Sequence, residues 1–586
     1  MSVEARSRPN THADPRGRRL ESWKEIAAYL GRDVTTARRW EKQERLPVYR
    51  LQHSKLGSIY AYTSELDAWR DKQALAGATD APAAQADHQP TRIWRARRGL
   101  LAGGVVLVGL LAAAYLTTRS RVVNATRPKI QSLAVLPLKN LSGDPTQEYL
   151  ADGMTEAFIG RLSDIRDLRV ISRTSVMRFK DAQLSVPEIA KTLQVDALVE
   201  GSVIREGNRI RVHAQLIRCA TDEHFWSETY DRELKDVLAL QSEVAQAIAR
   251  KVEVTVTGAE RARLVAARQV SPEVYESYLK GAFSESYSRI GVEQSIAYFE
   301  DAIRKDPTFA PAYLGLAGAY DALGSPGIGA APPSDVRPKV ISAARRALEL
   351  DPSLPGAHAT LGAVYQEQWQ WSEAEGEYRQ ALELSPNDAG VHLAFSGWLL
   401  CQARTEEAVA WSRRARELDP FGVTGDAVGW IQFQSRHYEE AIRELQSALA
   451  VHPNDASIYW FLGYALIANG QANEAIQVLE KGVALSGRSP GIIGVLVRAY
   501  ARAGRRTEAL RLVDELKRRQ RKGYIPAAAF VNAYLGLGDN EQALAWLEHA
   551  YQEQSMILQF IKVHPFFDPL RGDPRFVDLV RRVGLS

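Results

Sequence analysis

Cysteine is scarce in this sequence, which contains only two among 586 residues, Cys219 and Cys401. The two lie far apart in different segments, and nothing in the sequence predicts that the fold brings them together. So low a count excludes a scaffold held together by disulfides, and no ligand spacing typical of a zinc site occurs. We also expect no secretory signal peptide, because residues 1–20 are polar and rich in arginine.

The motifs of common catalytic sites are missing as well, since neither a nucleophile motif nor a glycine-rich phosphate loop occurs. Two groups of polar residues were considered as sites: His213, Cys219 and His224, and Asp144, Glu148 and Asp152. The first group falls on two expected strands and a turn, and the second is better placed to cap a helix N-terminus. The sequence therefore predicts no enzyme, no catalytic residues, no metal ligands and no cofactor.

A large net charge is absent too, because the whole chain carries +4. This balance hides an asymmetry: residues 1–98 contain 19 Lys and Arg against 12 Asp and Glu, a charge of +7, which leaves −3 for the other 488 residues. A basic N-terminal part suits a polyanion such as nucleic acid, or an anionic membrane surface.

Long apolar runs are few, and one stands out. Residues 99–116, GLLAGGVVLVGLLAAAYL, contain no charge, and as a helix they span about 27 Å, close to the ~30 Å hydrocarbon core of a bilayer. A buried core helix is the alternative, but such helices are rarely apolar on every face and flanked by arginines at both ends. We predict a transmembrane helix over residues 99–118.

The topology of this helix does not follow from its flanks, because each side carries four basic residues. If the N-terminal domain binds DNA, it lies in the cytoplasm, and the chain after Arg119 lies on the other side. The expected location is a bacterial inner membrane with a single span, a cytoplasmic N-terminus and a periplasmic C-terminal region.

Residues 20–73 are expected to form a small domain, after a disordered tail over residues 1–19 and before a linker rich in Ala, Pro and Asp over residues 74–98. Ser22 and Glu25 form a capping box for a first helix, and Gly31 ends it. A second helix follows from Val34 to Glu44. Two short helices joined by a tight glycine turn are typical of a helix-turn-helix.

Hydroxyl and guanidinium groups on this second helix suit phosphates and base edges. The following segments LPVY and GSIYAY alternate like a two-stranded wing, and a third helix begins at Ser64. The candidate DNA-binding residues are Arg32, Thr35, Thr36, Arg38, Arg39, Lys42, Lys55 and Tyr60.

The string SWKEIAAYLGRDVTTARRWEKQERLPV, followed by GSIYAYTSELDAW, resembles the winged helix-turn-helix units of the MerR and excisionase type. The resemblance implies a recognition helix in the major groove and a wing along the DNA backbone. A charged, solvated helix of a protein-binding module is the alternative.

After the apolar run, the pattern predicts a small α/β domain over residues 130–257 with the order β-α-β-α-β-β-β-α and a hairpin turn at Glu206-Gly207-Asn208. The strings LAVLPLKNLSGDPTQEYLADGMTEAFIGRLS and DALVEGSVIREGNRIRVHAQLI closely resemble the TolB amino-terminal-like domain. In that family the domain commonly lies between an N-terminal signalling module and tetratricopeptide repeats.

Residues 272–555 repeat with a period of 33 or 34 residues, most clearly at an alanine step: Ala374, Ala408, Ala441, Ala475, Ala509 and Ala543. The period and the motif around Tyr378 and Pro386 resemble tetratricopeptide repeats, which implies an all-α solenoid of about eight helix pairs with a concave groove for a peptide or protein. Residues 556–586 are expected to cap the last pair.

The expected fold is thus multidomain: winged helix-turn-helix, one transmembrane helix, small α/β domain and tetratricopeptide solenoid. The predicted function is a membrane-anchored transcriptional regulator that couples extracytoplasmic sensing or protein binding to DNA binding. Its partners would be promoter or operator DNA, a protein or peptide in the groove, the membrane, and a second copy in a homodimer. The alternative is an envelope scaffold whose N-terminal domain binds a cytoplasmic protein.

Overall fold

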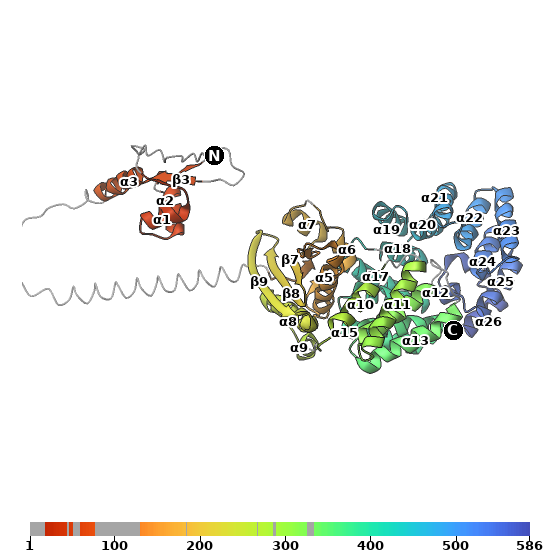
Figure 1. The fold of residues 1–586 in the computed structure, drawn as a ribbon. Coiled ribbons are helices and arrows are strands. Elements are labelled where there is room, and N and C mark those ends of the chain that lie inside the picture. The colour runs from red at the N-terminus through yellow and green to blue at the C-terminus, as the bar shows by residue number, and fades with distance from the viewer. Residues whose placement is uncertain are drawn as a thin grey trace, which may run out of the picture. The chain divides into compact units, whose positions relative to one another are not determined.

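The computed structural model describes residues 18–43, 46–50, 59–76, 129–182, 184–265, 268–284, 289–324, 333–422 and 424–585. The chain divides into two compact units, Met1–Thr126 and Arg127–Ser586, and each is described by itself (Figure 1). The predicted membrane helix and most of the predicted linker lie outside the described residues. Within the part of the chain that is described, no helix has the length and hydrophobicity that crossing a membrane requires.

Among its described residues, the smaller unit combines three helices with a three-stranded antiparallel sheet of order β1-β3-β2. Its elements are β1 (Arg19–Leu20), α1 (Trp23–Tyr29), α2 (Val34–Gln43), β2 (Tyr49–Arg50), β3 (Ile59–Tyr62) and α3 (Thr63–Ala76). Strand β1 was not expected, because Arg19 was assigned to a disordered tail. Leu20 is buried and pairs with Ala61, so the sheet begins where the tail was thought to end.

Local capping fixes the two helices that follow β1. The Ser22 side chain accepts a hydrogen bond from the Glu25 backbone N–H (3.2 Å), as expected, but the Glu25 carboxylate reaches back to the N–H of Glu21, one residue earlier than predicted (2.9 Å). Gly31 has φ +63°, and the N–H groups of Gly31 and Arg32 donate to the carbonyls of Ala28 and Ala27. This paired closure is a Schellman motif, which needs a left-handed residue at Gly31.

The second unit begins with a sheet domain over residues 129–265. Its six strands are β4 (Ser132–Val135), β5 (Lys139–Asn140), β6 (Arg169–Val170), β7 (Ala197–Glu206), β8 (Arg209–Arg218) and β9 (Glu223–Glu233). The order is β6-β4-β7-β8-β9, with β5 beside β7. Strands β4 and β5 pair in parallel with their neighbours, whereas β7, β8 and β9 form an antiparallel meander. The hairpin turn between β7 and β8 lies at Gly207, as predicted, with φ +61°.

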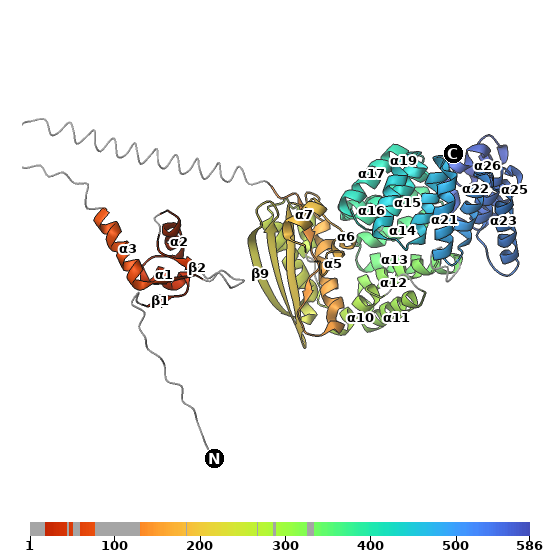
Figure 2. The same cartoon turned by 90° about the horizontal axis from the view of Figure 1, so that it is seen from above.

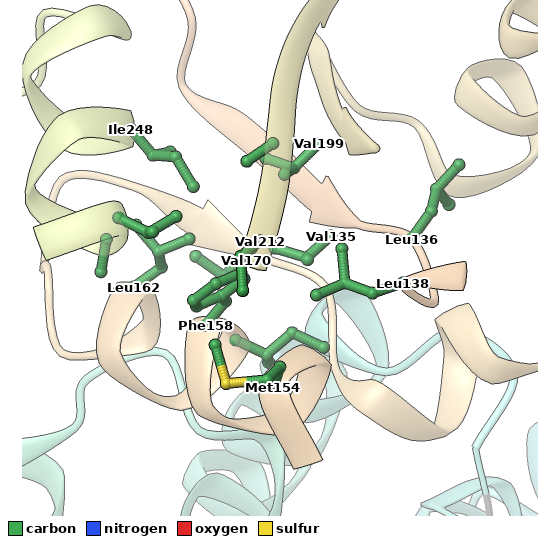
Figure 3. Close-up of a cluster of buried hydrophobic side chains, with 14 of the residues drawn as sticks. Val135, Leu136, Leu138, Met154, Phe158, Leu162, Val170, Val199, Val212 and Ile248 are labelled. Atoms are coloured by element: carbon green, nitrogen blue, oxygen red, sulfur yellow. The ribbon is translucent and has the colours of Figure 1, made fainter. Parts of the chain in front are cut away.

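The helices of the sheet domain are α5 (Glu148–Ser163), α6 (Arg173–Met177), α7 (Val186–Leu193), α8 (Val237–Lys251) and α9 (Gly258–Val265). Helix α5 packs between the sheet and the helices that follow (Figure 2). Met154 and Phe158 of α5 meet Val135 and Val212 of the sheet and Ile248 of α8 in one buried cluster (Figure 3). The predicted order of elements is recovered with three short additions, β5, α6 and α9.

The solenoid over residues 272–552 consists of eight helix pairs among the described residues. The pairs are α10 (Pro272–Ala282) with α11 (Arg289–Lys305), α12 (Ala310–Gly324) with α13 (Pro333–Leu350), α14 (Pro355–Glu367) with α15 (Trp371–Leu384), α16 (Ala389–Cys401) with α17 (Thr405–Leu418), α18 (Thr424–Gln434) with α19 (Tyr438–Val451), α20 (Ala456–Ala468) with α21 (Ala472–Leu485), α22 (Pro490–Arg502) with α23 (Arg506–Gln520), and α24 (Ala527–Leu537) with α25 (Asn540–Gln552). All six alanines of the 34-residue step are fully buried.

The C-terminal segment, residues 556–585, contains η3 (Met556–Phe560), η4 (Pro565–Leu570) and α26 (Pro574–Arg582). Helix α26 caps the last pair as expected, since Arg575 and Arg582 form ion pairs with Glu541 and Glu548 of α25. The rest of the segment does more than cap: η3 also contacts α14 and α16, and η4 contacts α24. It therefore runs back along the solenoid.

Candidate functional site

Helix α2 carries a basic stripe on the face that points away from the core. At about 100° per residue, Thr35, Arg38, Arg39 and Lys42 fall within one third of the helix circumference, and all four are exposed. Ala37 on the opposite face is fully buried. The Arg38 guanidinium lies 5.5 Å from the centre of the Trp23 ring, which ties the stripe to α1. A cationic stripe on a small, well-capped unit is suited to a polyanion.

Two other predicted residues on this side take different positions. Arg32 is exposed in the turn before α2. Thr36 is half-buried, and its hydroxyl donates to the Asp33 carboxylate (2.7 Å) while its backbone N–H donates to the other carboxylate oxygen (2.8 Å). These bonds lower the pKa of Asp33. Thr36 therefore serves the helix cap, and its hydroxyl is not presented with the basic stripe.

Tyr60 lies in the middle strand of the small sheet, between residues of both neighbours. The Arg19 guanidinium lies 4.2 Å from the centre of its ring, and Tyr49 stacks on it at 5.3 Å between ring centres. Tyr49 is exposed, so the row ends in an accessible aromatic ring. Lys55, the remaining predicted residue, lies outside the described residues.

The polar groups considered in the sheet domain take structural positions. His213 lies 3.1 Å from the Thr229 hydroxyl and His224 lies 3.3 Å from the Gln215 side chain, while burial raises the pKa of the Cys219 thiol to about 11. No group of three or more His, Cys, Asp or Glu suited to a metal ion occurs among the residues that the structure describes.

The three acidic residues near α5 divide into two roles. Asp144 caps η1 (Pro145–Gln147) by accepting from the Thr146 N–H (2.9 Å). Glu148 and Asp152 were expected to cap a helix as well, but both pair with Lys180 at 2.7 Å.

Loops that join successive helix pairs of the solenoid attach it to the sheet domain. The Asn387 side chain donates to the Ile165 carbonyl (2.8 Å), and the Ser172 N–H donates to the Leu418 carbonyl (2.8 Å). Arg268, in the connection after α9, pairs with Asp306. The Asn387–Ile165 and Ser172–Leu418 contacts join residues that are more than 200 positions apart. Periodicity does not reveal such contacts, so the sheet domain and the solenoid were predicted as separate domains.

Asp419 is the centre of this attachment. One oxygen of its buried carboxylate accepts hydrogen bonds from three hydroxyls at the start of α6, those of Ser172, Thr174 (2.8 Å) and Ser175 (2.5 Å). The Ser175 hydroxyl also accepts from the Phe421 N–H (2.8 Å). A charged acceptor with several donors forms a stronger and more directional joint than apolar contact alone.

Asp164, which directly follows α5 as its C-cap, lies at the same joint. Burial raises the pKa of its carboxyl to about 7, against the Ser385 hydroxyl and the positive charges of Arg263 and Arg161, which lower it. The group therefore changes charge near neutral pH in the folded protein.

The inner side of the solenoid is formed by the first helices of the pairs, because successive first helices from α12 to α24 contact one another. This side is the one that tetratricopeptide solenoids offer to partners. Here it is covered by the C-terminal segment: Gln559 accepts from the Gln366 amide of α14 (2.9 Å), and Phe566 contacts Phe433 of α18 and Tyr464 of α20. Trp371 donates to the Val583 carbonyl (2.9 Å).

Three sequence families match parts of the chain. Tetratricopeptide repeat families match residues 355–388 and, in two overlapping stretches, 432–485 and 466–530. A family described as "HilA/YgeH-like transcriptional regulator, second domain" matches residues 129–247, which is most of the sheet domain. The regulator family, rather than the TolB-like one, is thus the match found for this part.

One curated relative is a "Putative adenylate cyclase 3" of Rhizobium meliloti (strain 1021), 34% identical over 251 residues, which are 42% of this chain and 42% of the relative. The chain therefore spans less than half of the relative's length. Because only 126 residues precede Arg127, the match extends into the larger unit. The prediction that the chain is not an enzyme is contradicted by this relative, since a cyclase is an enzyme.

Solved structures show a distant likeness to parts of the chain. PilF of Pseudomonas aeruginosa is 22% identical with a TM-score of 0.31, covering 41% of this chain and 98% of PilF. YrrB, a "TPR protein with an unusual peptide-binding site", is 19% identical with a TM-score of 0.23, covering 32% of this chain and 91% of YrrB. The chain thus combines a segment similar to the second domain of HilA/YgeH-like transcriptional regulators with tetratricopeptide repeats.

Proposed function

We propose that the chain is a membrane-anchored transcriptional regulator. Its residues 18–76 bind DNA as a winged helix-turn-helix, residues 99–118 cross the membrane, and the TolB-like sheet domain with its solenoid binds a protein outside the cytoplasm. The observation that carries the proposal is the basic stripe of α2. It lies on the second of two short helices joined by a Schellman turn, which is where a recognition helix presents its side chains to the major groove.

Two further features support this assignment. The sheet β1-β3-β2 carries the cationic and aromatic row Arg19, Tyr60 and Tyr49, whose groups suit the DNA backbone beside the groove. The similarity of residues 129–247 to part of a transcriptional regulator family is consistent with regulation as the purpose of the whole chain.

The test of DNA binding is operator selection with residues 1–90, followed by Arg39→Ala. Loss of one guanidinium contact is expected to weaken binding by ~1–3 kcal/mol if it reaches a base edge, or to reduce the salt slope by about 1 if it reaches a phosphate. Arg70→Ala on α3 removes the same charge outside the stripe, where Arg70 pairs with Asp67 in an exposed contact. If both variants lose the same DNA-binding affinity, the basic stripe contributes only nonspecific charge and does not act as a recognition helix.

Topology is tested by reporter fusions after residue 90 and after residue 260 in a bacterial host. A cytoplasmic first fusion and an exported second fusion support the membrane regulator. If both fusions report the same side, residues 99–118 do not cross the membrane. The solenoid would then bind partners in the same compartment as the N-terminal unit.

The alternative function is an envelope scaffold whose N-terminal unit binds a cytoplasmic protein. Salt-dependent, sequence-selective binding of DNA by residues 1–90 separates the two, because a protein-binding module would bind DNA weakly and without sequence preference. The name of the curated relative favours one more assay, formation of cyclic AMP from ATP by the purified chain. Product above background would place an enzymatic activity beside the regulatory one.

A further inference from the structure

The C-terminal segment lies on the solenoid as a bound peptide would. It crosses the first helices of several pairs, and it contributes a row of apolar side chains that are almost completely buried: Leu558, Ile561, Phe566, Phe567 and Leu570. At its polar edge, Asp568 forms a bidentate ion pair with Arg436, which lies in the turn after α18, at 2.7 and 2.8 Å. Aromatic and acidic groups on a segment of short 3-10 turns therefore fit this surface.

The fit leaves one position unsatisfied, at Arg498 of α22. Its side chain is 3% exposed, and its guanidinium lies 3.6 Å from the centre of the Phe566 ring. Among the described residues, no hydrogen-bond acceptor lies within reach of its Nε and Nη1 atoms. The carboxylate of Asp568 attracts Arg498 from a longer distance, but it does not satisfy these two nitrogen atoms. A buried guanidinium with unsatisfied hydrogen-bond donors is costly, and a cation–π contact offsets only part of that cost.

The segment places a second basic group beside Arg498, whereas its own acidic residue, Asp568, pairs with Arg436 and Arg571. His564 is 1% exposed, contacts the same Phe566 ring at 5.4 Å between ring centres, and its Nε2 finds no partner within the described part of the chain. Burial and the nearby charge of Arg498 lower the pKa of His564 to about 3, and burial lowers the pKa of Arg498 to about 9. Each of the two basic groups thus disfavours the charged form of the other, at a position where an acidic group would stabilise the charge of Arg498.

We propose that the C-terminal segment is an intramolecular ligand of the solenoid and that a partner protein displaces it with a segment of similar chemistry. That partner segment carries aromatic side chains and an acidic residue whose carboxylate pairs with Arg498. The inference rests on the proposed function only in that the solenoid binds a protein. DNA binding by residues 1–90 is measured separately, so the failure of one does not hide the failure of the other.

Exchange of one segment for another is energetically plausible although the apolar contacts are extensive. A partner that fills the same positions regains the burial that the C-terminal segment gives up. The tethered segment has the advantage of a local concentration on the order of millimolar. A carboxylate on Arg498 would offset this advantage, because a hydrogen bond to a buried charged group changes affinity by a factor of ~10 to 100.

The experiment uses the full chain and a fluorescent synthetic peptide with the sequence of residues 556–572. Binding is followed by fluorescence anisotropy. Asp568→Arg in the protein places a cation against Arg436 and Arg571, which both pair with Asp568, and is expected to loosen the tethered segment and tighten peptide binding about tenfold. Glu440→Arg on α19 makes the same change of charge in an exposed pair with Arg443 and is expected to leave binding as in the wild type.

The acidic position is tested with two further peptides, carrying His564→Glu and His564→Gln. The Glu peptide is expected to bind at least tenfold more tightly than the Gln peptide, and the difference is expected to vanish in the Arg498→Met protein. If no peptide binds to the Asp568→Arg protein while its circular dichroism stays native, the segment is a permanent part of the fold and the proposal is wrong. Equal binding of the two peptides would overturn the assignment of Arg498.

Discussion

At the scale of single residues, the joint between the sheet domain and the solenoid depends on Asp419. Asp419→Ala removes the acceptor that the hydroxyls of Ser172, Thr174 and Ser175 share. Ser175 is buried, whereas Ser172 is half-buried and Thr174 is exposed, so water replaces the acceptor only in part. An unpaired buried hydroxyl costs ~1–3 kcal/mol, and we therefore expect a loss of about 2 kcal/mol in local stability. Hydrogen exchange of the α6 amides measures it.

The control for that substitution is Glu417→Ala, two residues earlier. Glu417 is exposed and pairs with Arg414 on its own helix, and exposed substitutions usually change stability by less than ~0.5 kcal/mol. Unchanged exchange in the Asp419→Ala protein would mean that the surrounding apolar contacts alone hold the two parts together.

His564 gives the fold a dependence on pH whose sign follows from its lowered pKa. The folded pKa is about 3 against an ordinary value of 6.5, so the released segment binds more protons between these values. The stabilising effect of a neutral His564 is complete above pH 6.5 and is lost as the pH falls toward 3. At pH 5.5 this group alone should cost ~1.4 kcal/mol.

That cost is measured as the difference between the wild type and His564→Gln in urea midpoints at pH 7.5 and pH 5.5. The glutamine has no proton to gain in this range, so the variant is expected to lose less stability on acidification. Other groups titrate as well, Asp164 among them with a folded pKa of about 7, but they affect both proteins alike. Parallel curves would show that His564 has the same pKa in the folded and the unfolded protein, so that its pKa is not lowered by burial.

Residue types and spacing predicted the exposed basic residues of α2, because an amphipathic helix leaves little freedom in which face is buried. They did not predict that the Thr36 hydroxyl donates a hydrogen bond to Asp33. A threonine in the first turn of a helix can either bond to the capping residue or face a ligand. Nor did residue types and spacing single out Asp419 or Arg498. Both gain their importance from partners more than 60 residues away, and no local pattern records such contacts.

At the scale of elements, the helix pairs are held close by small residues facing large ones. A Cβ atom added at Gly362 of α14 would lie 2.8 Å from the Tyr378 ring of α15, whereas one added at Gly376 of α15 would meet nothing within 4 Å. Gly362→Ala is therefore expected to destabilise the protein by ~1–3 kcal/mol through overpacking. Gly376→Ala should stabilise it by ~0.5–1 kcal/mol through helix propensity.

The two substitutions lie in one repeat and add the same methyl group, so thermal melts of the pair compare packing against propensity directly. Opposite shifts of the melting temperature are expected. Shifts of the same sign would mean that α14 and α15 adjust their separation freely.

The second helix of the small unit was predicted over Val34–Glu44 and is observed over Val34–Gln43, and the prediction of about eight helix pairs follows from the period of the repeat. Short elements were missed for a physical reason. Strands of two residues, such as β1 and β5, and the five-residue helix α6 are too short for either period to repeat, so no periodic pattern marks them. They exist because β3, β7 and Asp419 supply partners, which is tertiary information.

At the scale of the whole molecule, the path of the C-terminal segment was the least predictable feature. Its apolar residues indicated that it packs somewhere, and the nearest surface is the last helix pair. Instead the solenoid curves so that Tyr551, in the last pair, stacks on Trp369 between α14 and α15, with 5.0 Å between ring centres. Curvature sums small rotations over many repeats, so a local sequence pattern does not reveal which surfaces finally meet.

Regulation by the proposed mechanism requires that a small DNA-binding unit gains affinity from pairing. The basic stripe offers four side chains, Thr35, Arg38, Arg39 and Lys42, which suffice for few base contacts. Residues 1–90 fused to a dimeric coiled coil in place of the remaining chain should therefore bind a site with two half-sites ~10²–10⁴-fold more tightly than residues 1–90 alone. Titration by gel shift at fixed salt measures the ratio.

The spacing of the half-sites provides the internal control for that prediction. Two recognition helices related by a twofold axis reach the same side of DNA when the half-sites are one helical turn apart, about 10–10.5 base pairs. Adding about five base pairs rotates one half-site to the far side, so the gain from dimerisation should disappear with the longer spacing while each half-site keeps its own affinity. A gain in affinity that survives the longer spacing would point to nonspecific charge as its source. If dimerisation gives no gain at any spacing, pairing is not part of the mechanism, and the outer region cannot regulate DNA binding by pairing the N-terminal units.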